Sequence, residues 1–121
     1  MPVSQETTKA LPMLRNNVPR AVLSAYRDTC AAEGLRGGDT LTHLMRGLVR
    51  GHVTALEPLP AGADHDKIQY RVPARTLKDF RHHCLEQDLN EGQALAGLMH
   101  LFTTKVVNIT AYTQKQEQTN D

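Results

Sequence analysis

An internal repeat is the feature that most constrains how this chain folds. Residues 18–48 align without a gap with residues 72–102, an offset of 54 residues, and ten of the 31 aligned positions are identical. The chain has 121 residues, and units of about 40 residues rarely bury enough surface to fold alone. The two copies are therefore expected to stabilise each other. In the first copy the identical residues are Val18, Pro19, Leu23, Arg27, Cys30, Leu35, Gly38, Leu41, Leu44 and Met45.

Each copy predicts an extended segment, a helix, a short break and a second helix. The extended segments end in Val-Pro, because the residue before a proline favours the β region and proline is well suited to the first turn of a helix. Breaks are predicted at residues 34–39 and 88–92, and Asn90 with Gln93 fits a capping box. Both predicted helices of each copy carry an apolar face at spacings of three and four. These faces are Leu23, Tyr26 and Cys30 with Leu41, Leu44, Met45 and Leu48, then Leu77, Phe80 and Cys84 with Leu95, Leu98, Met99 and Phe102.

The repeat divides the chain into five segments. Residues 1–10 and 108–121 are polar ends expected to be flexible. Residues 11–52 and 66–107 are the two copies. Residues 53–65 are the linker between them. Residues 57–66 are rich in Pro, Gly and Ala, so this stretch is expected to have no packing obligations.

Pairing of the two extended segments would satisfy the backbone hydrogen-bonding groups of both segments. A two-stranded antiparallel ribbon and four helices would then share one core, which gives a mainly α-helical fold with a small sheet. In the second copy Ile68, Tyr70 and Val72 are expected to face that core. Lys67, Gln69 and Arg71 alternate with them and are therefore expected to face solvent. In the first copy Asn16 is a polar residue at an inward position.

The outward residues of the second segment are chemically suited to read DNA. A two-stranded ribbon fits the major groove, where Arg and Lys reach acceptors on guanine and Gln pairs with adenine. The alternative is an ordinary solvated face, which any half-exposed strand also presents. Arg20 and Arg75 follow the two prolines and are expected to contact the DNA backbone, which positions a protein without reading sequence.

With these features the chain resembles the ribbon-helix-helix (Arc/MetJ-type) family of DNA-binding proteins, in the tandem single-chain form of conjugation and T-DNA accessory proteins. The resemblance covers residues 12–50 and 66–106. It implies that the strand residues two, four and six positions before each proline contact bases, and that backbone N–H groups at the start of the second helix hold a phosphate. Because the two strands differ, it also implies an asymmetric DNA site. The implied base-reading residues are Met13, Arg15, Asn17, Lys67, Gln69 and Arg71, and the implied phosphate contacts include Gly37, Gly38, Asn90 and Gly92.

The resemblance implies duplex DNA as the partner, with two modules associating on adjacent DNA sites and with contacts to relaxosome or transcription proteins. The function would be transcriptional regulation or an accessory role in conjugative DNA processing. Two alternatives stay open: a DNA-binding antitoxin, for which the tail offers only Ile109 and Tyr112 as large apolar anchors, and a helical protein-interaction module without a DNA role.

Composition limits the other classes of function. The net charge is +1, so any basic surface must come from local clustering. Two cysteines without a CxxC motif favour a reducing, cytoplasmic setting and are expected to pack in the core. No apolar run approaches the roughly 20 residues that span a membrane. The histidines are not spaced to converge on a metal ion, and no phosphate loop, nucleophile elbow or HExxH motif is present. We therefore expect neither enzyme activity nor a cofactor.

Overall fold

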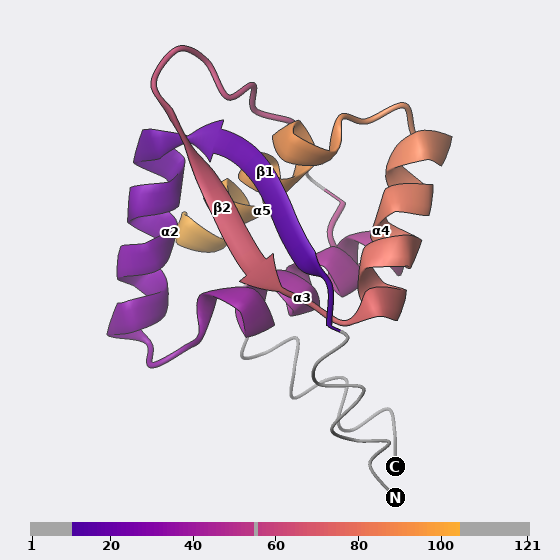
Figure 1. Ribbon diagram of the computed structural model, residues 1–121, viewed down its shortest axis with the longest axis horizontal. Helices are drawn as coiled ribbons and strands as arrows, with labels where there is room; N and C mark the ends of the chain where they lie inside the picture. The colour runs from indigo at the N-terminus through magenta and orange to yellow at the C-terminus, as the bar shows by residue number, and fades with distance from the viewer. Residues whose placement is uncertain (1–10, 55, 105–121) are drawn as a thin grey trace, which may run out of the picture.

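The computed structural model describes residues 11–54 and 56–104, and its elements follow the order strand, helix, helix, strand, helix, helix (Figure 1). Residues 1–10, 55 and 105–121 lie outside the described residues, and with them the predicted flexible ends, the last residues of the second copy, and Ile109 and Tyr112. The elements are β1 (Met13–Pro19), α2 (Arg20–Ala32), α3 (Gly37–Val49), β2 (His65–Arg71), α4 (Ala74–Glu86) and α5 (Glu91–Thr103).

The predicted ribbon is confirmed, because β1 and β2 form a two-stranded antiparallel sheet. Its register pairs Leu14 with Tyr70 and Asn16 with Ile68. Leu14, Val18 and Ile68 have no exposed surface, and neither has Val72, which directly follows β2. A shift of one residue would turn these apolar side chains to solvent, so burial of the inner face fixes which side chains point outward.

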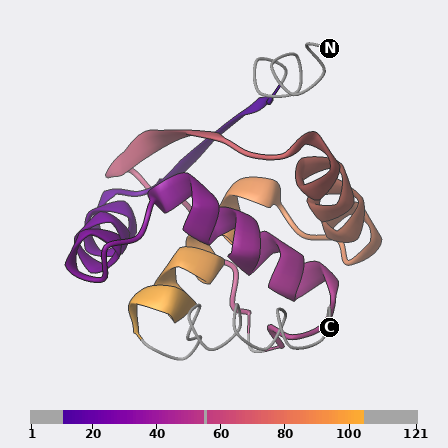
Figure 2. The ribbon, with the colours of Figure 1, turned by 90° about the horizontal axis from the view of Figure 1, so that it is seen from below.

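The four helices bury the apolar faces that their spacing predicts, and the ribbon lies across one side of them (Figures 1 and 2). At the centre of the core Tyr26 packs edge-to-face against Phe102, with ring centroids 5.8 Å apart. Cys30 and Cys84 are buried in this core, as predicted. Loss of hydration on burial raises the pKa of the Cys84 thiol to about 11, so the thiol stays protonated at neutral pH.

The two breaks are shorter than predicted, because α3 begins at Gly37 and α5 at Glu91. Gly37–Asp39 and Glu91–Gly92 therefore belong to first turns of helices. The turn that ends α2 has Gly34 at φ 69° and the turn that ends α4 has Asp88 at φ 55°. In both turns the next amide donates a 2.8 Å hydrogen bond to the cysteine carbonyl, Leu35 to Cys30 and Leu89 to Cys84. This is the bond that closes a Schellman motif.

The prediction of a linker without packing obligations is wrong. Val53 is buried, and Leu56 and Leu59 pack against the core. The Leu59 amide also donates a 3.0 Å hydrogen bond to the Gln93 carbonyl of α5. The segment passes so close to α5 that a Cβ atom on Gly97 would lie 2.5 Å from the Glu57 carbonyl oxygen. These apolar residues are spaced three apart, but Pro58 and Pro60 argue against a helix there, so the sequence did not reveal that they pack.

In the described part of the chain, no helix combines the length and the apolar character that crossing a bilayer requires.

Candidate nucleic-acid interface

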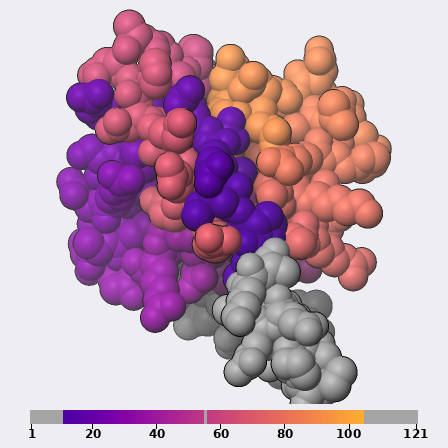
Figure 3. Space-filling view, viewed as in Figure 1, coloured from indigo at the N-terminus to yellow at the C-terminus, as the bar shows by residue number. Residues whose placement is uncertain are grey.

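The outer face of the ribbon gathers all six residues that the sequence predicts to read bases. The antiparallel register places each residue of β1 directly opposite one of β2: Met13 with Arg71, Arg15 with Gln69, and Asn17 with Lys67. Met13 is half-buried and the other five are exposed. In the space-filling view, atoms of both strands run down the middle of one face, between α2 and α4 (Figure 3).

This face carries three cationic side chains and two amides. Arg15 and Lys67 lie on different strands, so the positive charge is spread over the ribbon. Arg71 lies at one end, where one of its terminal nitrogens donates a 2.8 Å hydrogen bond to the Leu11 carbonyl. That bond ties down the side chain and leaves its remaining donors directed to solvent.

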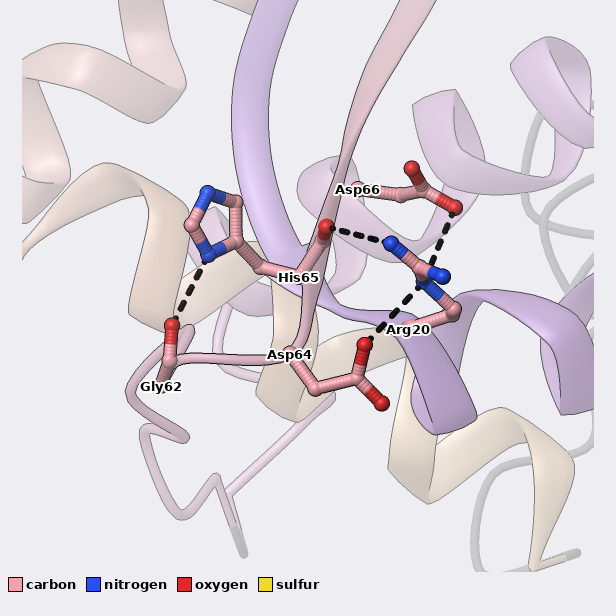
Figure 4. Close-up of polar contacts among 5 residues, drawn as sticks. All are labelled: Arg20, Gly62, Asp64, His65 and Asp66. Carbon is pink, nitrogen blue, oxygen red and sulfur yellow. Dashed lines mark hydrogen bonds and ion pairs between the residues drawn. The ribbon is translucent and has the colours of Figure 1, made fainter.

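The other end of the ribbon is acidic, which the sequence analysis missed. Arg20, a predicted phosphate contact, lies between two carboxylates, with its Nε 3.2 Å from Asp64 and 3.5 Å from Asp66 (Figure 4). A terminal nitrogen of Arg20 also lies 3.4 Å from the His65 carbonyl. The His65 ring turns the other way and lies 2.8 Å from the Gly62 carbonyl. The side chains of Arg20, Asp64 and Asp66 are 58%, 80% and 50% exposed, so the pairs are screened by salt. The two carboxylates nevertheless compete with a phosphate for the Arg20 guanidinium.

The first turn of α3 abuts β2. A Cβ atom on Gly37 would lie 2.8 Å from the Tyr70 hydroxyl, and one on Gly38 would lie 3.3 Å from the Arg71 carbonyl oxygen. The Tyr26 hydroxyl donates a 2.6 Å hydrogen bond to the Gly37 carbonyl, which anchors this turn from α2. No side chain caps α3. The free N–H groups of a helix start favour an anion, and here they lie beside the ribbon; Asp39 in the same turn opposes that preference.

The first turn of α5 abuts β1 in a similar way. A Cβ atom on Gly92 would lie 3.1 Å from the Asn16 side-chain oxygen and 3.3 Å from the Asn17 carbonyl. Asn16 therefore points inward, as predicted, and lies against a helix start. Of the two hydrogen bonds of the predicted capping box, the first is confirmed: the Asn90 side chain accepts a 3.0 Å hydrogen bond from the Gln93 backbone amide.

Two neighbouring charges modify the start of α5. Glu91 lies in the first turn and pairs with Arg81, at 2.9 Å between Oε1 and Nε. The Asn90 bond uses one of the free N–H groups, so α5 offers fewer donors than α3 does.

Arg75 lies apart from the other predicted contacts. It is exposed in the first turn of α4 and lines a hollow with Arg46 of α3 and with Arg50, which directly follows α3. Arg46 and Arg50 are four residues apart in the sequence, but only the packing of α3 on α4 shows that Arg75 joins them. Within residues 11–54 and 56–104, no group of three His, Cys, Asp or Glu side chains is arranged to hold a metal ion.

No family model, curated protein or solved structure matches this chain.

Proposed function

We propose that this protein binds double-stranded DNA at a specific sequence, with the β1–β2 ribbon in the major groove. One observation carries the proposal: exposed Arg, Lys, Gln and Asn side chains from both strands share the outer face, while the inner face is buried. A ribbon of this kind fits the groove, and these side chains match the hydrogen-bonding edges of guanine and adenine.

The proposed contacts follow from the position of each residue on the ribbon. Arg15, Lys67 and Arg71 would reach guanine acceptors, and Gln69 and Asn17 would pair with adenine. Met13 would touch the methyl group of a thymine. Since the facing residues differ in every pair, the preferred site would lack two-fold symmetry.

We further propose that the chain is a tandem ribbon-helix-helix protein, in which residues 11–52 and 66–107 form an intramolecular pseudo-dimer. Equal element lengths support this: each strand has seven residues and each helix has 13. The matching turns after Cys30 and Cys84 support it as well. The two copies would each supply one strand to the ribbon, as two subunits do in a dimer of single units.

Phosphate contacts would flank the ribbon. The starts of α3 and α5, with Gly37, Gly38, Asn90 and Gly92, lie against opposite strands and would approach the DNA backbone on either side of the groove. Arg20 would contribute only if the DNA phosphate displaced the carboxylates of Asp64 and Asp66.

The biological role that suits this chemistry is a cytoplasmic transcriptional regulator or an accessory protein of a conjugative DNA-processing complex. Both roles need a sequence-specific anchor on duplex DNA, with copies bound side by side on adjacent sites.

The test is fluorescence anisotropy with labelled duplexes selected from a random pool. The variant Lys67→Ala, Gln69→Ala, Arg71→Ala removes the β2 half of the outer face. We expect it to lose the preference for the selected site and at least about tenfold in affinity, because each good base contact contributes about 1–3 kcal/mol. Affinity of the unaltered protein should fall as salt rises, as release of counterions from phosphates requires.

A matched control removes the same three residue types from exposed positions on α2, on α4 and directly after α4: Arg27→Ala, Lys78→Ala, Gln87→Ala. Circular dichroism verifies that both variants fold. The control should keep its site preference. Equal binding by the two variants, or no duplex binding by the unaltered protein at low salt, would refute the proposal and leave a protein-interaction module as the better explanation.

A further inference from the structure

A basic hollow lies between α3 and α4. Its volume is about 310 Å³, and its walls are Arg46, Val49, Arg50, Arg75, Thr76 and Asp79. Three guanidinium groups face one carboxylate there, so the hollow keeps a net positive charge. Its volume is at the lower end of the range for small-molecule sites.

One of the three arginines is held in place by the protein. The Arg46 Nε donates a 3.0 Å hydrogen bond to the Thr76 hydroxyl, and Thr76 is only 5% exposed. This bond uses the inner nitrogen and leaves both terminal nitrogens of Arg46 available. Arg46 is therefore a half-buried, oriented cation rather than a freely moving surface side chain.

No ion pair within the described part of the chain involves the positive charges of the hollow. The ion pairs found in residues 11–54 and 56–104 involve Arg20, Arg81 and His82 as cations, and none involves Arg46, Arg50 or Arg75. Like charges gathered in one concave site repel each other, and a bound anion would relieve that repulsion. Guanidinium groups match phosphate oxygens in geometry and bind them in a bidentate manner.

We propose that this hollow binds the phosphate group of a small phosphorylated molecule. Arg46, Arg50 and Arg75 hold the phosphate. Asp79 offers an acceptor to a hydroxyl of the ligand, which favours a phosphorylated alcohol such as a sugar phosphate or a nucleotide.

The position of the hollow favours a free ligand over the DNA of the proposed function. The C-terminal half of α3 carries Arg46 and is followed directly by Arg50. This part of the chain leads away from the strands and passes below α4 in the view of Figure 2. A duplex lying on the outer face of the ribbon would meet the starts of α3 and α5 before it met this hollow. The inference therefore does not depend on DNA binding.

The test uses inorganic pyrophosphate as the probe, titrated at constant ionic strength into the ¹⁵N-labelled full chain and followed by amide chemical shifts. We expect saturable shifts confined to residues 46–50 and 74–79. The variant Arg50→Gln, Arg75→Gln should weaken binding by at least about tenfold, since bonds to a charged group are the stronger class. The control Arg27→Gln, Lys78→Gln removes two cations outside the hollow and should bind as the unaltered protein does.

A second arm separates a free ligand from the DNA backbone. If the hollow holds a small molecule, the Arg50→Gln, Arg75→Gln variant keeps the salt dependence of duplex binding, whatever its strength. Unsaturable or widely spread shifts, or equal pyrophosphate binding by that variant, would overturn the proposal. So would a salt slope lowered by about two units in the variant, because it would assign the arginines to DNA phosphates. Failure of the ribbon variant to alter DNA binding would leave the pyrophosphate result untouched.

Discussion

At the residue scale, Asp88 holds a backbone angle that residues with a side chain rarely adopt. Its φ of 55° lies in the left-handed region, and Gly34 holds a φ of 69° in the corresponding turn after α2. Glycine adopts this region freely, whereas other residues meet steric resistance there that is smallest for Asn and Asp. The second turn therefore carries a small strain that the first turn avoids.

Replacing Asp88 by glycine should raise stability. Relief of the left-handed angle contributes up to about 1 kcal/mol and the added freedom of the unfolded chain offsets part of it, so the net gain should be about 0.5 kcal/mol. In a domain of this size that corresponds to a rise of roughly 2–4 °C in Tm. The reciprocal change Gly34→Ala should lower Tm although a Cβ atom there would touch nothing within 4 Å. A lower Tm for Asp88→Gly would show that the Asp88 side chain stabilises the turn more than its backbone angle costs.

At the scale of elements, the segment between α3 and β2 packs against α5. It seats Leu56 and Leu59 on the core, and α5 admits it because Gly97 lacks a side chain. A methyl group at position 97 would lie 2.5 Å from the Glu57 carbonyl oxygen and 2.7 Å from a Leu56 methyl group. The first of these is backbone, so it cannot simply rotate away.

Gly97→Ala should therefore destabilise the protein. Alanine gains up to about 1 kcal/mol in helix propensity, but overpacking of a filled site costs about 1–3 kcal/mol, so the net loss should be about 1–2 kcal/mol in urea unfolding. Ser24→Ala on the exposed side of α2 is the control, because it tests propensity without a close approach. If Gly97→Ala were as stable as the unaltered protein, the segment could leave α5 at little cost.

These elements separate what sequence predicts from what it does not. The alternation of the strands and the apolar faces of the helices depend on neighbours within one element, so Ile68, Val72 and the faces of the four helices were predicted. The contact of Leu56 with Gly97 joins residues far apart in the sequence, so no periodicity within one element predicts it. The neighbours of Arg20 come from the start of β2, far along the chain, and a strand pattern states which side a residue faces but not which charge will lie beside it.

The charge distribution of the whole molecule gives the ribbon a basic part and an acidic end. Arg15, Lys67 and Arg71 are exposed on the outer face, whereas Asp64 and Asp66 surround Arg20 where β2 begins. In the proposed complex those two carboxylates would lie close to the phosphates of one strand of the duplex. They would repel the DNA and also compete with it for Arg20.

Asp64→Asn, Asp66→Asn should therefore tighten binding to the selected duplex, by roughly threefold or more at low salt, and should increase the salt slope by about one unit as Arg20 gains a phosphate. Anisotropy titrations at several salt concentrations measure both quantities. Asp28→Asn, Glu86→Gln removes two negative charges from exposed positions on α2 and α4 and controls for net charge alone. Adding Arg20→Ala to the double variant should return the slope to its original value. If the slope does not change in the double variant, Arg20 is not a phosphate contact, and the two carboxylates serve only to hold the first turn of α2 against the start of β2.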